Sequence, residues 1–110
     1  MNMSMEEFTN LANETLREKA ATLKALSFEE VENLPWAFAE DVLVGKKEVQ
    51  ITVYKQANLP QLGDDLLITV QLARFGLGGV AIYLEEEGIV FSKTKAVRQA
   101  TGEELAATRG

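Results

Sequence analysis

Histidine and cysteine are both absent from the 110 residues of this chain, and their absence is the first limit on its chemistry. Catalytic Ser-His-Asp and Cys-His systems therefore cannot be built, and neither can zinc or copper sites that use imidazole or thiolate ligands. Disulfide bonds are impossible as well, so the core alone must hold the fold together. Any chemistry must come from hydroxyl, amine, amide or carboxylate side chains.

The hydroxyl and amine groups offer one local arrangement, in which Ser92 is followed by Lys93 and Lys95. Ser-Lys pairs can act as nucleophile and base without histidine. This segment has no recognised catalytic spacing, however, and the other two serines, Ser4 and Ser27, occupy helix-capping positions. We therefore expect no catalytic residue, and we expect the protein not to be an enzyme.

The carboxylates form three local clusters, namely Glu40 with Asp41, Asp64 with Asp65, and Glu85 with Glu86 and Glu87. Neighbouring residues of a strand point to opposite faces, so consecutive carboxylates in the first and third clusters do not converge easily. The middle pair lies in a predicted loop, where Asp is common because it hydrogen-bonds its own turn. None of the spacings matches an EF-hand. We expect no metal site and no cofactor.

Two features that invite a ligand-binding interpretation are better explained as structural. The segment Gly76-Leu77-Gly78-Gly79 lacks the ending of a phosphate-binding P-loop, and it precedes a predicted strand rather than a helix. It is therefore interpreted as a flexible hairpin or bulge. The single tryptophan, Trp36, lies between the predicted helices and the predicted sheet, and we expect it to pack across this junction.

The charge of the chain argues against nucleic acid and anionic membrane surfaces as partners. Seventeen acidic residues against eleven basic ones give a formal net charge of −6, which excludes a general positive field. Residues 1–41 contain nine acidic and three basic residues, so the acidity belongs to the N-terminal part. The short basic stretch of Lys93, Lys95 and Arg98 is flanked by no aromatic array that could stack on bases.

The hydrophobic pattern predicts one compact domain without a membrane-spanning segment. Hydrophobic residues make up 46% of the chain, which is adequate for a core, and the length suits a single domain. No apolar stretch approaches the roughly 18 residues that a membrane span needs. The N-terminus has no basic region followed by an apolar core, so no secretory signal is predicted and a cytoplasmic location is expected.

Three helix starts are marked by capping boxes, in which Ser or Thr precedes Glu by three residues. They are Ser4 with Glu7, Ser27 with Glu30, and Thr101 with Glu104. The first opens a helix over about residues 5–26, whose apolar stripe consists of Met5, Phe8, Ala12, Leu16, Ala20, Leu23 and Leu26. A short helix over about 28–34 ends against Pro35, and a further short helix is predicted over about 102–108.

Between the second and third helices the apolar spacing changes from 3.6 to 2, which is typical of half-buried antiparallel strands. Strands are predicted over about residues 38–44, 48–55, 66–75, 80–86 and 89–93, with tight turns at 45–47, 76–79 and 86–88. No segment is long enough for a crossover helix between parallel strands. The prediction is a single α+β domain, an antiparallel four- to five-stranded β-meander covered by the long N-terminal helix, with the two short helices at its ends.

The alternation also predicts which side chains face away from the helices. In the strand over 80–86, Val80, Ile82 and Leu84 are expected in the core. The outward face of the sheet is predicted to carry Gln50, Thr52, Tyr54, Thr69, Gln71, Ala73, Ala81 and Tyr83. This face is uncharged, whereas a fully solvated face usually carries Lys and Glu, and Tyr is enriched in the cores of interfaces.

The leading hypothesis is therefore a small, soluble, acidic, non-catalytic interaction or adaptor protein. It is expected to bind a protein partner or a second copy of itself through the outward sheet face. A small-ligand-binding domain that uses the space between loop 56–65 and the helices is the second hypothesis. The third is an unusual carboxylate-based enzyme. Motifs that define a known family are absent from the sequence.

The long helix and the sheet are expected to share one core, which two substitutions test. Leu16→Ala or Ile68→Ala should each lower the free energy of unfolding by about 2–5 kcal/mol, because each removes buried apolar groups and leaves a cavity. Thermal denaturation measures the effect. Unchanged midpoints for both variants would contradict a shared core.

Overall fold

The computed structural model describes residues 4–94 and 96–107, and these form an α+β fold with five antiparallel strands. The helices are α1 (Met5–Lys24), α2 (Phe28–Glu32) and α3 (Gly102–Ala107), with a 3₁₀ turn at Leu77–Gly79. The strands are β1 (Ala37–Val44), β2 (Lys47–Gln56), β3 (Leu66–Phe75), β4 (Ala81–Phe91) and β5 (Val97–Gln99). They lie side by side in chain order, so the predicted antiparallel meander with a long covering helix is confirmed.

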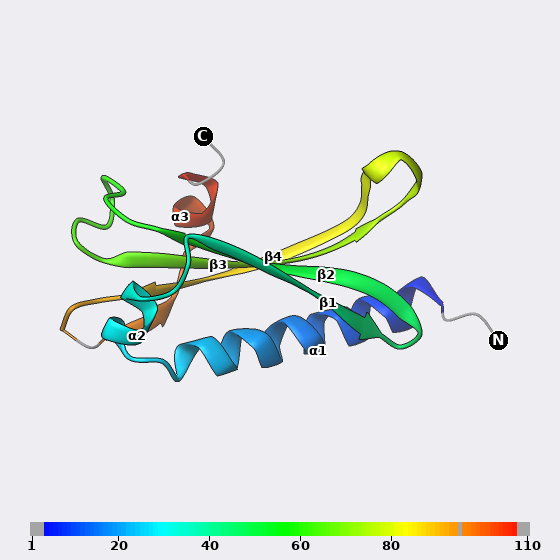
Figure 1. Ribbon diagram of the computed structural model, residues 1–110, viewed down its shortest axis with the longest axis horizontal. Helices are drawn as coiled ribbons and strands as arrows, with labels where there is room; N and C mark the ends of the chain where they lie inside the picture. Colours follow the sequence, from blue (N-terminus) through cyan, green and yellow to red (C-terminus); the bar gives the residue numbers. More distant parts are fainter. Residues whose placement is uncertain (1–3, 95, 108–110) are drawn as a thin grey trace.

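The two faces of the sheet are covered differently (Figure 1). α1 runs along one face, and its predicted stripe supplies the buried residues Phe8, Ala12, Leu16, Ala20 and Leu23. α3 and the hairpin between β3 and β4 rise on the other side, at opposite ends of the long axis. We call the face away from α1 the open face, and it lies between these two projections.

The main core fills the space between α1 and the sheet. The strands supply alternate residues to it: Val49, Ile51, Val53, Ile68, Val70, Leu72, Ile89 and Phe91. Leu16 and Ile68, both predicted as core residues, are buried in it. At its margin, Lys19 Nζ lies 2.8 Å from Glu40 Oε1 and joins α1 to β1.

A second, smaller core lies at one end of the open face, beneath α3. Its members are Leu62, Leu67, Val90 and Ala100, with Leu59 and Leu105 packed against them. Leu67 opposes Val90 in the register of β3 and β4. Residues 66–70 are therefore buried on both faces of the sheet, whereas the sequence pattern predicted a single apolar face.

Side-chain caps start the helices. Ser4 Oγ accepts a hydrogen bond from Glu7 N at 3.1 Å, and complete capping boxes begin α2 at Ser27 and α3 at Thr101. α1 and α2 both end two residues earlier than predicted, at Lys24 and Glu32. Within the described ranges, no helix combines the length and the apolar character that crossing a membrane requires.

The predicted turn at residues 86–88 is wrong, because β4 continues from Ala81 to Phe91. The strands predicted over 80–86 and 89–93 are one strand paired with β3. Gly88 has a different role, since a Cβ there would lie only 2.7 Å from Ala100 Cβ and 2.6 Å from Leu105 Cδ2. The glycine marks a close approach to the sheet rather than a turn.

The fifth strand lies where no strand was predicted. β5 pairs with the end of β4, so that Ile89 opposes Gln99 and Phe91 opposes Val97. All three residues of β5 are exposed, and no apolar alternation marks them. Lys95, from the Ser-Lys arrangement, and Thr108, at the end of the last predicted helix, lie outside the described residues.

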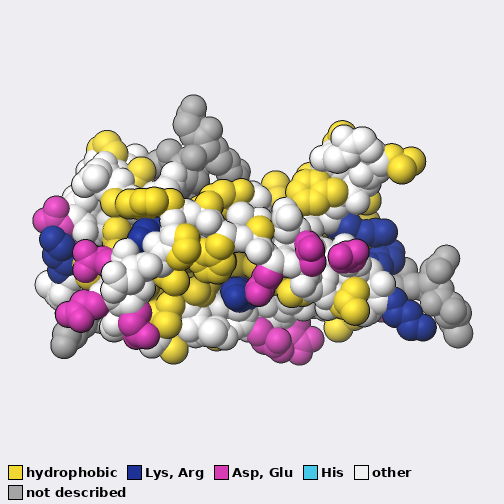
Figure 2. All heavy atoms as spheres, in the orientation of Figure 1, with side chains coloured by type: hydrophobic (Ala, Val, Ile, Leu, Met, Phe, Trp, Pro, Cys, Tyr) yellow, Lys and Arg dark blue, Asp and Glu magenta, His cyan; other side chains and the backbone are white. Residues whose placement is uncertain are grey.

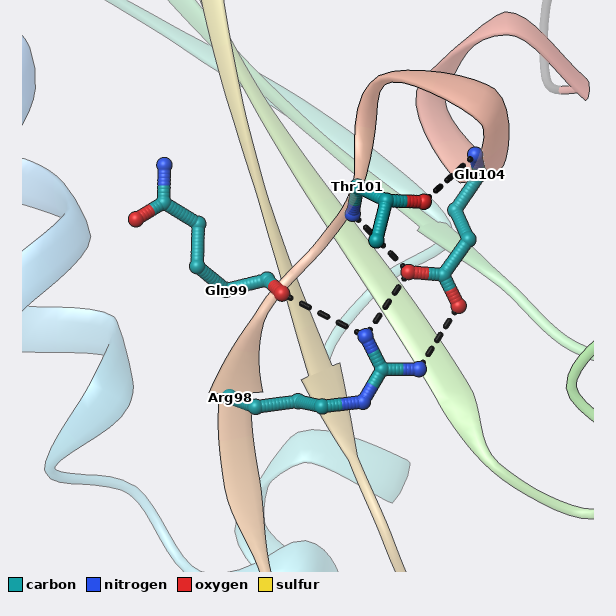
Figure 3. Close-up of polar contacts among 4 residues, drawn as sticks. All are labelled: Arg98, Gln99, Thr101 and Glu104. Atoms are coloured by element: carbon teal, nitrogen blue, oxygen red, sulfur yellow. Dashed lines mark hydrogen bonds and ion pairs between the residues drawn. The ribbon is translucent and has the colours of Figure 1, made fainter.

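Arg98 joins β5 to α3 through Glu104 (Figure 3). Its guanidinium donates to Glu104 Oε1 at 2.8 Å and to Oε2 at 2.7 Å, and Thr101 N donates to Oε1 at 2.9 Å. Hydrogen bonding from Arg98, and then from the Thr101 backbone, lowers the pKa of Glu104 from 4.5 to about 2. The carboxylate thereby holds α3 over the second core.

The stabilisation from Glu104 should depend on pH. A carboxyl whose pKa is lower in the folded state stabilises fully above its unfolded pKa, near 4.5, and loses this contribution as the pH falls toward about 2. Glu104→Gln should therefore lower the thermal midpoint by a few degrees at neutral pH, and the difference from wild type should shrink over that acidic window.

The exposed neighbour Glu103 offers the matched control, because it also lies in the first turn of α3. Glu103→Gln should leave the midpoint close to that of wild type. A Glu104→Gln effect that stays constant across the acidic range would contradict the assignment of the stabilisation to the ionised carboxylate.

Candidate functional site

The register of the strands brings the predicted interaction residues into rows on the open face. The rows pair Tyr54 with Thr69, Thr52 with Gln71, and Gln50 with Ala73, and β4 continues two of them with Glu86 beside Gln71 and Leu84 beside Ala73. Five of the six predicted residues, Gln50, Thr52, Tyr54, Thr69 and Gln71, therefore point to one face of the sheet, where Thr69 is buried. Their side chains are uncharged, as the sequence showed.

The sixth predicted residue, Tyr83, lies on the opposite side of the sheet, so its outward placement is wrong. Its ring meets the Phe8 ring of α1 edge to face, with centroids 4.9 Å apart and planes at 82°. Its hydroxyl donates to Glu85 Oε1 at 2.8 Å, and burial, followed by this hydrogen bond, raises the pKa of the phenol. Alternate residues of a strand share a face, so burial of Ile89 and Phe91 against α1 places Tyr83 on that side too.

Because Tyr83 faces α1, its neighbours Ile82 and Leu84 face the other way, so their predicted place in the core is wrong. They are 56% and 51% exposed, and Val80, beside them, is exposed as well. The register between β3 and β4 shifts at Arg74 and Phe75, where the two strands leave the sheet. The predicted period of two is present, but it does not say which of the two faces is buried.

We call residues 75–84 the hairpin arm. Its exposed large hydrophobic residues are Phe75, Leu77, Val80, Ile82 and Leu84, and Leu77 is fully exposed. No charged residue occurs in these ten positions, although a quarter of the chain is charged. Figure 2 shows hydrophobic and uncharged surface along the projecting part of the arm, at the upper right. Exposed apolar residues gathered in one segment make the arm a candidate interaction site.

A hollow of about 490 Å³ opens on the open face and reaches the base of the arm. Its lining residues are Trp36, Tyr54, Lys55, Gln56, Thr69, Gln71, Leu84 and Glu86. Trp36 precedes β1 and Tyr54 lies in β2, and Leu84 joins the hollow to the hairpin arm. The hollow and the arm are therefore parts of one surface.

Trp36 borders the hollow and does not pack across the junction as predicted, since 63% of it is exposed. Its ring centroid lies 4.5 Å from Lys55 Nζ, which is a cation–π contact. The buried Lys55 ammonium also donates to the carbonyl oxygens of Glu32 and Leu34, at 2.6 and 2.5 Å. Lys55 thus binds the end of α2 to β2, and its donors are already used within the chain.

Two polar side chains that line the hollow contain buried oxygens without a hydrogen-bond partner. They are Thr69 Oγ1 and Gln56 Oε1, and Thr69 as a whole is only 4% exposed. A buried polar atom left unpaired costs about 1–3 kcal/mol, and few such atoms occur in native structures. Both oxygens have almost no accessible surface, so a group in the hollow does not reach them as the lining stands.

The catalytic candidates from the sequence do not assemble in the described ranges. Ser92 Oγ lies 2.9 Å from Thr94 Oγ1 and accepts a hydrogen bond from Thr94 N, an arrangement typical of a turn. Glu85 and Glu86 lie on opposite faces of β4, as adjacent strand residues must. Among the residues that the structure describes, no group of three or more Asp or Glu could hold a metal ion.

The space that a ligand was expected to use, between loop 56–65 and the helices, is occupied by side chains. Leu59 and Leu62 of this loop belong to the second core. A different hollow, of about 470 Å³, lies between α2 and the ends of β4 and β5. Its lining residues include Phe28, Phe91 and Val97, and none comes from residues 57–65.

No protein-family model, curated protein or solved structure matches this chain. The open face, the hairpin arm and the hollow between them are therefore the features from which a function can be proposed. The sequence analysis did not identify the hairpin arm as a candidate site. Its one sequence signal is the ten-residue run without charge, which is unusual in so charged a chain.

Because Tyr83 and Leu84 point to opposite faces, their replacement should change the stability by different amounts. Tyr83→Ala should lower the free energy of unfolding by about 2–3 kcal/mol, because it removes a packed ring and its contact with Phe8. Leu84→Ala should change it by less than about 0.5 kcal/mol. Urea denaturation at submicromolar protein, followed by circular dichroism, compares the two. A larger loss of stability for Leu84→Ala than for Tyr83→Ala would instead support the orientation predicted from the sequence.

Proposed function

We propose that this protein is a non-catalytic interaction protein that forms a homodimer through its open face and hairpin arm. The observation that carries the proposal is the arm itself, in which five large hydrophobic residues are exposed on a ten-residue segment without charge. Such a surface is stabilised when a second apolar surface removes it from water. The absence of histidine and cysteine supports the non-catalytic part of the proposal.

The other surfaces of the molecule are poorly suited to self-association. α1 and α2 belong to residues 1–41, which carry the whole net charge of −6, so two copies of this side repel each other. The free edge of β1 has Glu40 and Asp41 at its centre, and antiparallel pairing of two copies about that centre would place like charges opposite each other. The hairpin arm carries no charge, and on the open face the side chains of Gln50, Thr52, Tyr54 and Gln71 are uncharged, with Glu86 beside Gln71.

Light scattering tests the proposal directly. Wild type should have the mass of a dimer, and Leu84→Asp should have the mass of a folded monomer because it places a carboxylate in the interface. The double variant Tyr54→Glu with Gln71→Lys should also be monomeric. Met5→Asp is the control, since it changes another exposed hydrophobic residue, on the α1 side, and should leave the dimer intact.

A wild-type mass of one chain at concentrations on the order of 100 µM would contradict the proposal. An unchanged dimer in both Leu84→Asp and the double variant would contradict the choice of surface. The cytoplasmic location expected from the sequence belongs to this proposal, because a homodimer of this kind needs no oxidising compartment and has no disulfide to lose.

A further inference from the structure

We infer that the hollow between α2 and the ends of β4 and β5 binds a small organic cation, in which an ammonium group is joined to an aromatic body. We call this site the α2 hollow. Its volume of about 470 Å³ lies within the range of small-molecule sites, which is roughly 300–1,000 Å³. The inference goes beyond the proposed homodimer and does not depend on it.

The α2 hollow lies on the covered side of the sheet, at the end of the molecule away from the hairpin arm (Figure 1). Val97 opposes Phe91 in the register of β5 and β4, and residues directly opposite each other share a face. Phe91 belongs to the main core, so Val97 lies on the α1 side as well. α1 ends at Lys24, however, and Val97 remains 40% exposed. The hollow opens where the chain passes from α1 to α2.

Much of the lining of the α2 hollow is apolar and aromatic. Phe91, which is almost fully buried, lines it together with the partly buried Leu26 and Phe28 and the exposed Val97. Two phenyl rings suit an aromatic ligand, because aromatic groups pack edge to face or offset against each other. The face of a phenyl ring also attracts a cation.

The charges around the α2 hollow select the sign of the ligand. Among the residues that the structure describes, the charged ones in its lining are Glu29 and Glu32 on α2 and Lys93 after β4. The two glutamates are three residues apart, so their side chains lie on one face of the helix. An anionic ligand would be attracted by Lys93 but repelled by both glutamates. Residues 1–41 carry the whole net charge of −6, and this acidic surrounding adds to the attraction of a cation.

The wall that carries the glutamates is held in place without a ligand. Val31 of α2 is fully buried, and a complete capping box starts the helix. At the other end, Lys55 donates hydrogen bonds to the carbonyl oxygens of Glu32 and Leu34. The site is therefore formed before binding, which lowers the cost of ordering it around a ligand.

Phenethylamine is the probe, because it is protonated at neutral pH and joins one phenyl ring to one ammonium group. Titration into isotope-labelled protein, followed by NMR, should shift the backbone amide signals of Phe28, Ser92 and Val97, with a Kd on the order of 1 mM. Hydrocinnamate, an anionic counterpart, and ethylamine, which lacks the ring, should each bind at least about tenfold more weakly.

Charge variants test the two walls separately. Glu29→Gln with Glu32→Gln should raise the Kd of phenethylamine about fivefold, because it removes both carboxylates of the α2 wall. Lys93→Gln should lower the Kd about twofold, because it removes a charge of the same sign as the ligand. Glu14→Gln with Glu18→Gln is the matched control. It removes the same charge from exposed positions of α1 outside the hollow and should change the Kd by less than about twofold.

A size variant tests the hollow without a change of charge. Val97→Phe adds a ring where the ligand is expected to lie, and it should raise the Kd at least about fivefold. Val97 is partly exposed, so the variant should fold, and circular dichroism checks that it does. A Kd equal to that of wild type would overturn the location of the site.

The remaining outcomes decide between this site and a general acidic field. An absence of shifts at phenethylamine concentrations of roughly 20 mM would overturn the site. Equal binding of hydrocinnamate, or a higher Kd for Lys93→Gln, would overturn the choice of a cation. An effect of the α1 control as large as that of the α2 double variant would show a general field. None of these measurements depends on the mass of the protein, so failure of this site and failure of the homodimer are distinguishable.

Discussion

Burial of Ile89 and Phe91 beneath α1 is the constraint on which the rest of the structure depends. Both belong to β4, and in a continuous strand the side of one residue determines the side of every second residue along it. Tyr83 must therefore turn toward α1, where Phe8 receives its ring. Leu84 must then turn away, onto a face that α1 does not cover.

The open face is covered at one end only. There the second core forms beneath α3, with Gly88 leaving room for Leu105 and the Arg98–Glu104 ion pair closing the end of the chain over it. Beyond Gly88 no element of the described ranges lies over the sheet, and the strands continue into the hairpin arm. The apolar surface is thus exposed because α3 covers only one end of the open face.

The two sides of the molecule differ in charge. The acidic residues of α1 and α2 lie on the covered side, whereas the open face and the arm combine mainly amide, hydroxyl, aromatic and aliphatic groups, with Glu86 as a charged member. Burial of the uncharged groups needs no removal of water from ions, so its cost is small. The proposed homodimer rests on this difference in charge.

The sequence by itself determined the fold class, the capped helix starts, the stripe of α1 and five of the six residues on the open face. These depend on local spacing, in which neighbours along the chain decide the outcome. The side on which Tyr83 lies, the continuity of β4 through Gly88 and the exposure of the hairpin arm were decided only by tertiary structure. A period of two is the same whichever face is buried, and a glycine that ends a strand looks in sequence like one that admits a neighbour. Only the positions of α1 and α3 against the sheet distinguish these cases, because they alone determine which face is removed from water.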